Sequence, residues 1–146
     1  MNLNDTVEFY IRTTSLALSR MYNAIAADYG ITQTVGYILI YVKKDGTSSS
    51  KIANLLGMKK SSLTRILQKM EDDGCITRQV DKSDKRIVNI FLTKKGVERR
   101  RIAKKTVLEF NAKLTELTDE KDLKSFAKVS KLIGELTQEK LENTQK

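Results

Sequence analysis

The sequence predicts a mostly α-helical protein with one small β-hairpin, an α+β arrangement organised around a short pair of helices. Apolar residues recur at helical spacing along most of the chain, and the period changes to alternation only over residues 76–92. Excess positive charge is concentrated on and just after the helix pair. With 146 residues, the chain is long enough for one domain with an added oligomerisation element.

The predicted helix pair spans residues 48–74. The first helix places Ile52, Ala53 and Leu56 on one face, and Gly57 follows where a sharp turn favours a residue without a Cβ. A second apolar series begins six residues after that glycine, at Leu63, Ile66, Leu67 and Met70. A small residue, a glycine four positions later and apolar residues ten and thirteen positions later are typical of a helix-turn-helix.

The opposite face of the second helix is polar and suits contact with DNA. Hydroxyl, amide and guanidinium groups bind base edges in a major groove, and this face carries Ser61, Ser62, Thr64, Arg65 and Gln68. Phosphate contacts are predicted for residues at the two helix starts, namely Ser50, Lys51, Lys59 and Lys60.

Two strands are predicted after Gly74, which we expect to end the second helix. They cover residues 76–80 and 87–92, and the loop between them is polar and mostly charged. A hairpin beside a helix-turn-helix is a wing, so the fold class is a winged helix-turn-helix. The cations of the loop, Lys82, Lys85 and Arg86, are predicted to bind DNA.

Longer helices are predicted on both sides of this unit. One covers about residues 4–27, one covers 31–44 with Thr32 or Thr34 as its N-cap, one follows Thr93 to about residue 117, and a last helix starts at 118–119. Their apolar stripes are larger than a small winged core needs, which favours homodimerisation through both chain ends. The predicted division is a DNA-binding lobe at 31–93 and a dimerisation region at 1–30 and 94–146.

The charge distribution favours a polyanionic partner. Residues 47–105 hold 16 basic and 6 acidic side chains, whereas the flanking segments are close to neutral. We expect no signal peptide and no membrane span, because the longest apolar run covers only residues 37–42. A single cysteine, which excludes an internal disulfide, suits a reducing cytoplasm.

Catalytic and metal-binding functions are disfavoured. Ser48 and Lys51 fit an S-x-x-K motif, but the partner motifs of the acyl enzymes that use it are missing. The chain has no histidine, so we expect neither a transition-metal site nor a cofactor. Cys75 opens the first predicted strand and is interpreted as a buried structural thiol, with a redox sensor as the alternative.

These residues together resemble the MarR family of bacterial transcriptional regulators. The resemblance runs from about residue 31 to 103 and is carried by Ile52-Ala53, Gly57, Leu63-Thr64-Arg65, Gly74, Arg78, Asp84-Lys85-Arg86 and Leu92-Thr93-Lys94-Lys95-Gly96. It implies a triangular homodimer with interleaved terminal helices, bound to a pseudo-palindromic operator and often released by a small ligand or by oxidation. It also implies that Asp84 shapes the wing and that Arg86 enters a minor groove.

The chain departs from the family pattern at two positions. Lys59 stands where a capping serine is frequent, which leaves the start of the second helix open by a residue or two. Lys82 replaces a frequent proline in the wing, which should make its tip more flexible.

The sequence therefore predicts a homodimeric, cytoplasmic, double-stranded-DNA-binding transcriptional regulator, a repressor released by a small ligand, and not an enzyme. A winged-helix module that binds an acidic protein surface is the alternative, and a ligand carrier is disfavoured by the position of the charge. Tyr10, Arg12, Tyr22, Tyr37 and Tyr41 are candidates to line an effector pocket between the dimerisation helices and the lobe.

Overall fold

The computed structural model describes residues 2–144, which form two compact units, one ending at Lys105 and one beginning at Thr106. The elements of the first unit are a short 3-10 helix η1 (Leu3–Asp5), α1 (Val7–Ala27), α2 (Gln33–Tyr41), β1 (Thr47–Ser48), α3 (Ser49–Leu56), α4 (Lys60–Asp72), β2 (Ile76–Val80), β3 (Val88–Leu92) and the start of α5 (Lys94–Glu116). The second unit holds the rest of α5 and α6 (Glu120–Thr144).

Threonine side chains cap the starts of α1 and α2. Thr6 accepts a hydrogen bond from the Phe9 N–H at the start of α1, and Thr32 accepts one from Val35 at the start of α2. The predicted first helix is therefore wrong by three residues at its start, because residues 3–5 form a 3-10 turn. The second helix ends at Tyr41 and not at residue 44, because Val42 is extended and the Lys43 N–H bonds the Thr47 hydroxyl.

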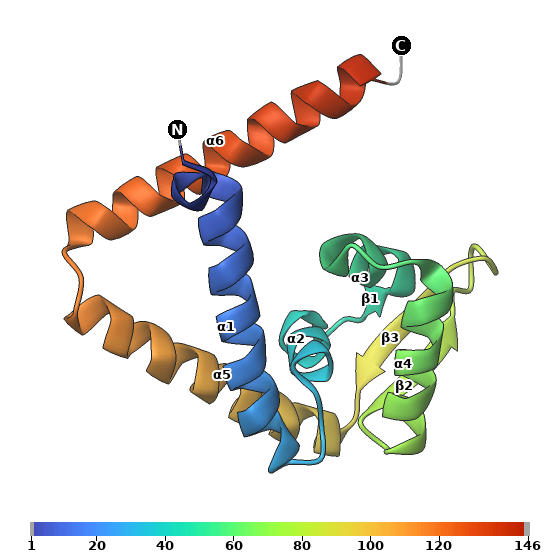
Figure 1. Ribbon diagram of the computed structural model, residues 1–146. Helices are drawn as coiled ribbons and strands as arrows, with labels where there is room; N and C mark the ends of the chain where they lie inside the picture. The colour runs from blue at the N-terminus through green and yellow to red at the C-terminus, as the bar shows by residue number, and fades with distance from the viewer. Residues whose placement is uncertain (1, 145–146) are drawn as a thin grey trace. The chain divides into compact units, whose positions relative to one another are not determined.

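A three-stranded antiparallel sheet completes the first unit, with strand order β1-β3-β2 (Figure 1). The register pairs Ile76 with Leu92 and Val80 with Val88, as expected for the predicted hairpin. Strand β3 begins at Val88, one residue later than predicted, because the Ile87 N–H bonds the Asp84 carbonyl inside the wing turn. The two-residue strand β1, where Thr47 pairs with Ile90, is absent from the sequence prediction.

The core of the first unit lies among α2, α3, α4 and the sheet. It contains the inward faces predicted for these elements, and its buried apolar residues are Ile38, Leu39, Val42, Ile52, Ala53, Leu63, Leu67, Met70, Cys75, Ile76 and Ile90. Ile66 and Leu56, also predicted to face inward, are half-buried and pack against this core. The Cys75 side chain is 1% exposed, so the burial predicted for this thiol is confirmed.

The join between the sheet and α5 is tight. The Thr93 hydroxyl accepts a hydrogen bond from the Gly96 N–H (3.1 Å), as predicted for an N-cap, and donates one to the Gly74 carbonyl (2.6 Å). Gly96 is buried, and a Cβ at this position would lie 2.0 Å from the Cys75 carbonyl oxygen. Glycine is therefore required there to let α5 start against the end of α4.

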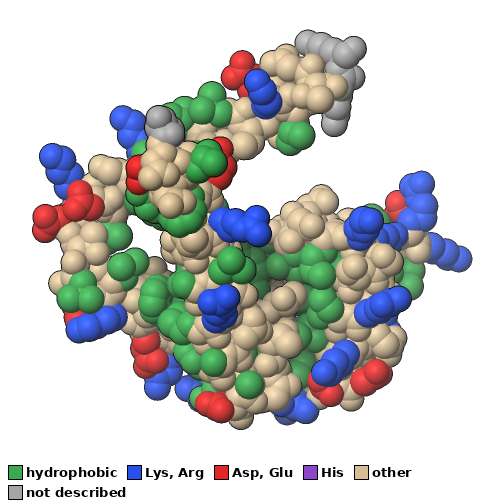
Figure 2. Space-filling view, viewed as in Figure 1, with side chains coloured by type: hydrophobic (Ala, Val, Ile, Leu, Met, Phe, Trp, Pro, Cys, Tyr) green, Lys and Arg blue, Asp and Glu red, His purple; other side chains and the backbone are tan. Residues whose placement is uncertain are grey.

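The outer helices carry apolar side chains that this chain leaves exposed. In the first unit these include Ile11 and Leu16 of α1. In the second unit α6 exposes Phe126, Val129, Leu132, Leu136 and Leu141. Figure 2 shows hydrophobic side chains, in green, at the surface along this helix. Within residues 2–144, we find no helix with the length and hydropathy needed to cross a membrane.

Candidate nucleic-acid interface

The turn between α3 and α4 has the predicted form. Ser48 caps α3 by accepting a hydrogen bond from the Lys51 N–H (3.3 Å), and Gly57 ends α3 in the left-handed conformation at φ 60°. Ser50 and Lys51 lie exposed in the first turn of α3. Helices α3 and α4 thus form the predicted helix-turn-helix.

Helix α4 begins at Lys60, and its N-cap Lys59 makes no side-chain capping bond, which resolves the helix start left open by the sequence. Leu63, Leu67 and Met70 are buried, so the opposite face points away from the core. The predicted DNA contacts of this face are all exposed, namely Ser61, Ser62, Thr64, Arg65 and Gln68. The structure therefore places them together on one accessible surface.

Two of these polar side chains already have partners. The Thr64 hydroxyl donates to the Lys60 carbonyl (2.8 Å), which leaves its oxygen able to accept. The Gln68 amide nitrogen donates to Asp72 (2.8 Å), and its oxygen accepts from Arg78. Gln68 is thus held in one orientation at the end of the polar face that lies nearer β2.

The wing turn is organised by Asp81, which follows β2. Its Oδ1 accepts from the Ser83 N–H (2.9 Å), the Ser83 hydroxyl and the Asp84 N–H (3.1 Å), and its Oδ2 accepts from the Asn89 amide (3.1 Å). Together these bonds, those from Ser83 foremost, lower the pKa of Asp81 from an ordinary 3.8 to about 2. The carboxylate supplies acceptors for backbone N–H groups that the seven-residue turn, residues 81–87, leaves without strand partners.

Asp84 and Arg86 form a second contact within the wing. Asp84 accepts from the Arg86 N–H (3.0 Å) and, with its two oxygens, from Nε and an Nη of the guanidinium (3.1 Å each). These side-chain bonds lower the pKa of Asp84 and raise the pKa of Arg86. The Arg86 side chain is nevertheless 90% exposed, so the arginine projects from the wing with one guanidinium edge held.

The predicted basic residues lie at the surface around these elements. Lys59, Lys60, Lys82, Lys85 and Arg86 are all exposed. Figure 2 shows lysine and arginine side chains gathered over α4 and the wing, at the right of the view. This region therefore combines positive charge with the polar face of α4.

Several cations after the wing have structural partners. Arg99 donates to the Tyr29 carbonyl (2.7 Å), Arg100 donates to the Val42 carbonyl (3.2 Å), and Lys95 donates to the Asp73 carbonyl. Part of the excess positive charge thus binds the ends of α1, α2 and α4. It cannot all be assigned to a nucleic-acid surface.

Two contributors to the site were absent from the sequence prediction. Asp81 orders the wing, and the spacing Asp81-Lys82-Ser83 is typical of an Asx turn, so a local signal existed. Glu71 binds Arg78 across the turn after α4, but the pair joins a helix to a strand. Periodicity alone contains no signal for such a contact.

The tyrosines considered for an effector pocket separate into two groups. Tyr37 and Tyr41 lie one turn apart on α2 with ring centroids 4.7 Å apart, and their hydrogen bond, followed by burial, raises the pKa of Tyr37. Tyr10 instead packs edge-to-face against Phe9 on α1, with ring centroids 6.0 Å apart. Burial raises the pKa of Tyr22. Among these candidates, the structure thus places the Tyr37 and Tyr41 rings side by side.

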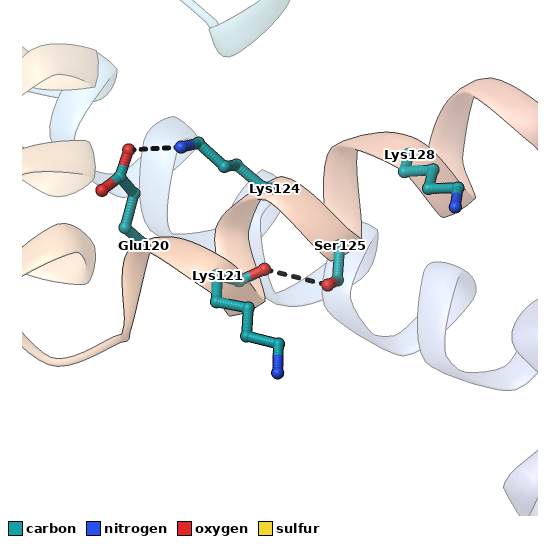
Figure 3. A pocket seen from close by; sticks show the side chains of 5 residues that line it. All are labelled: Glu120, Lys121, Lys124, Ser125 and Lys128. Carbon is teal, nitrogen blue, oxygen red and sulfur yellow. Dashed lines mark hydrogen bonds and ion pairs between the residues drawn. The ribbon is translucent and has the colours of Figure 1, made fainter.

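A surface concavity on α6 has no comparable organisation. Figure 3 shows its lining of Glu120, Lys121, Lys124, Ser125 and Lys128, all from the first turns of that helix. Lys124 is paired with Glu120 (2.7 Å), and the Ser125 hydroxyl bonds the Lys121 carbonyl (2.9 Å). These local contacts are those of a solvated helix face.

Comparisons of sequence find similarity to helix-turn-helix transcriptional regulators. The family model described as "MarR family" matches residues 32–88. The HTH-type transcriptional regulator TtmR of Methylorubrum extorquens is 29% identical over 96 residues, which are 65% of this chain and 49% of that protein. PetP of Rhodobacter capsulatus, also an HTH-type transcriptional regulator, is 35% identical over 54 residues, 37% of this chain and 32% of PetP. The chain spans about half or less of these relatives.

Solved structures share the fold over most of the chain. AbsC, a MarR family transcriptional regulator from Streptomyces coelicolor, is 25% identical with a TM-score of 0.79, covering 94% of this chain and 98% of AbsC. MepR of S. aureus in its DNA-binding conformation is 23% identical with a TM-score of 0.80, covering 90% and 98%. MepR in a complex with DNA gives a TM-score of 0.77 at 24% identity with the same coverage.

The family match covers the helix-turn-helix and most of the wing, and the fold match extends over the outer helices. Residues 32–88 thus match the MarR family by sequence, and the chain shares its fold with solved MarR family transcriptional regulators over most of its length.

Proposed function

We propose that this protein binds double-stranded DNA with sequence preference and regulates transcription. The observation that carries the proposal is the exposed polar face of α4, which lies in the same surface region as the cations of the helix start and of the wing (Figure 2). A recognition helix in the major groove needs such a face, with phosphate contacts on either side. The relative MepR has been solved in complex with DNA, which supports the same partner here.

Each group of residues has a proposed role. Arg65 would discriminate a guanine by donating two hydrogen bonds, with hydroxyl and amide contacts from Ser61, Ser62, Thr64 and Gln68. Positions at the helix starts and the wing would bind phosphates, namely Ser50, Lys51, Lys59, Lys60, Lys82 and Lys85. Arg86 would enter a minor groove while Asp84 holds its backbone and one guanidinium edge.

The working form would be a homodimer on a pseudo-palindromic operator. The exposed apolar side chains of α1 and α6 support this assembly, because water-exposed leucine, isoleucine and phenylalanine stripes are stabilised by burial against a second chain. We assign residues 31–93 to DNA binding and residues 1–30 and 94–146 to dimerisation. The cytoplasm is the corresponding location, since operator DNA lies there.

A repressor role with release by a small ligand completes the proposal. It rests on the family relationship, with the adjacent Tyr37 and Tyr41 rings as the candidate contact for such a ligand. Operator-directed expression of a reporter, with and without the protein, would test the sign of regulation. Increased reporter expression with the protein would contradict repression.

Selection from a pool of randomised DNA duplexes tests the central claim. The full chain should enrich a sequence with two related half-sites, and its affinity should fall steeply as salt rises, because bound cations displace counterions from phosphates. A winged-helix module for acidic proteins would instead bind all duplexes alike. Failure to enrich any sequence at moderate salt would contradict sequence-specific binding.

A further inference from the structure

The last turn of α4 is fastened to the wing by one ion pair. The Arg78 N–H donates to Glu71 Oε1 (3.1 Å), and the Arg78 guanidinium donates to Oε2 through Nε (2.9 Å) and an Nη (2.6 Å). The two side chains are 26% and 33% exposed. A single carboxylate thus receives three donors from one residue of β2.

The same guanidinium also fixes the orientation of Gln68. Arg78 donates to the amide oxygen of Gln68, and the amide nitrogen of Gln68 donates to Asp72 (2.8 Å). An arginine can only donate and a carboxylate can only accept, so the oxygen of Gln68 must face Arg78 and its nitrogen must face Asp72. Gln68 keeps one N–H and one lone pair for a further partner.

The contacts of Arg78 with Glu71 and Gln68, called the tether below, join two parts of the proposed DNA surface. Gln68 lies one turn beyond Arg65 on the exposed face of α4. Arg78 is the central residue of β2, and its register partner on β3 is Ile90, which is completely buried. The base of the wing is therefore held by the core on one side and by the last turn of α4 on the other.

We propose that Arg78, through Glu71, is a positioning residue that holds the wing and the Gln68 carboxamide in one fixed relation to the recognition helix. Rigid placement reduces the ordering needed on binding and thus favours correctly matched DNA over other DNA. The proposal rests on the DNA-binding function proposed above. Arg78 itself needs no contact with DNA for this role.

A charge-matched pair of variants separates positioning from electrostatics. Glu71→Gln and Asp73→Asn each remove one negative charge near the end of α4, and Asp73 is exposed. If charge alone matters, both variants should bind DNA slightly more tightly. If Glu71 positions the wing, Glu71→Gln should bind the selected duplex about fivefold more weakly than Asp73→Asn does, the order expected for a partly exposed ion pair.

The binding probes are a duplex selected by the wild-type chain from a random pool and a scrambled duplex of the same length. The two variants should bind the scrambled duplex equally. Amide hydrogen exchange of the free protein should be faster over residues 76–80 in Glu71→Gln than in Asp73→Asn, which tests the tether without DNA. Thermal denaturation of both variants identifies any global loss of folding.

Arg78→Lys provides a second, specific readout, because lysine keeps the charge but lacks the guanidinium fork. It should weaken sequence preference at the same base pair whose preference disappears in Gln68→Ala. Equal binding of Glu71→Gln and Asp73→Asn to the selected duplex would overturn the positioning role alone. Failure of the wild-type chain to select any duplex would instead overturn the DNA-binding function, and this proposal with it.

Discussion

Arg65 and Lys60 lie on the same helix but offer DNA different chemistry. Arg65 stands on the exposed face of α4, opposite Leu63 and Leu67, and its planar guanidinium can donate two parallel hydrogen bonds. Lys60 stands at the helix start and presents a single ammonium group. The first suits a base edge, whereas the second suits a phosphate.

Replacing each side chain should therefore affect binding differently. Arg65→Ala should weaken binding to the selected duplex more than to random DNA, and discrimination at one symmetric base pair should fall by about 1–3 kcal/mol. Lys60→Ala should weaken both by similar factors and lower the salt slope by about one unit for each phosphate that is no longer neutralised. Titrations over single-base-substituted duplexes at two salt concentrations measure both effects. A uniform decrease in affinity in Arg65→Ala would contradict its role in binding a base.

Asp81 gives the wing a defined dependence on pH. Its pKa is lowered from 3.8 to about 2, so the folded wing favours the charged carboxylate. This stabilisation is complete above about pH 4 and is lost as the pH falls through about 2. The amide NMR shifts of Ser83 and Asp84, which donate to this carboxylate, should change over that range.

An Asp81→Asn variant should lose the part of this pH response that Asp81 causes. The amides of Ser83 and Asp84 should also exchange faster at neutral pH, because the amide oxygen of asparagine is a weaker acceptor than a carboxylate. Asp45→Asn, which changes an exposed carboxylate outside the wing, is the control and should leave these signals unchanged. Identical pH profiles in Asp81→Asn and the unmodified chain would rule out this role.

At the scale of elements, the start of α5 depends on close backbone packing. The Thr93 cap, the Gly74 carbonyl and the buried Gly96 bring the end of α4 and the first turn of α5 together. No side chain at position 96 fits, because its Cβ would lie 2.0 Å from a backbone oxygen that cannot rotate away. The sequence therefore tolerates only glycine without a shift of α5.

Gly96→Ala should destabilise the protein by about 1–3 kcal/mol, the usual cost of overpacking. Gly134→Ala is the matched control, because Gly134 lies within α6 and an added Cβ would meet nothing within 4 Å. That control should stabilise its helix by up to about 1 kcal/mol. Chemical denaturation at one fixed protein concentration compares the two variants. Equal effects would show that the close approach to Cys75 is unimportant.

At the scale of the whole molecule, α1 and α6 each leave large apolar side chains exposed to water. Both helices are amphipathic. Their apolar faces are nevertheless exposed in the single chain, at Ile11 and Leu16 of α1 and at Phe126 and Leu132 of α6. Such surfaces are unfavourable in water and are stabilised by about 25 cal/mol per Å² of apolar area that a partner buries. This is the physical basis for the proposed homodimer.

Removal of residues 119–146 should abolish the dimer and expose the remaining apolar stripes. The full chain should sediment as a dimer at micromolar concentration, whereas the truncated chain should aggregate or unfold. Removal of residues 142–146 alone is the control and should preserve the dimer, because it spares the apolar side chains from Phe126 to Leu141. A dimer that persists after the longer truncation would contradict assembly through α6, and a stable, soluble monomer would contradict the expectation that the remaining apolar stripes need a partner.

Local sequence patterns determined most of the elements and the exposed face of α4. The spacing of Leu63, Leu67 and Met70 is sufficient to orient that helix, and Gly57 marks its turn, because both depend on neighbours within a few residues. The same holds for β2, whose bounds agree with the prediction.

Only the tertiary structure decided how these elements are fastened together. β1 is two residues long and exists through its pairing with β3, which is distant in sequence. The Glu71 contact with Arg78, the held orientation of Gln68 and the approach of Gly96 to Cys75 likewise join separate elements. Periodicity describes which face of an element is buried, whereas contacts between elements depend on register and distance, which are set when the core packs.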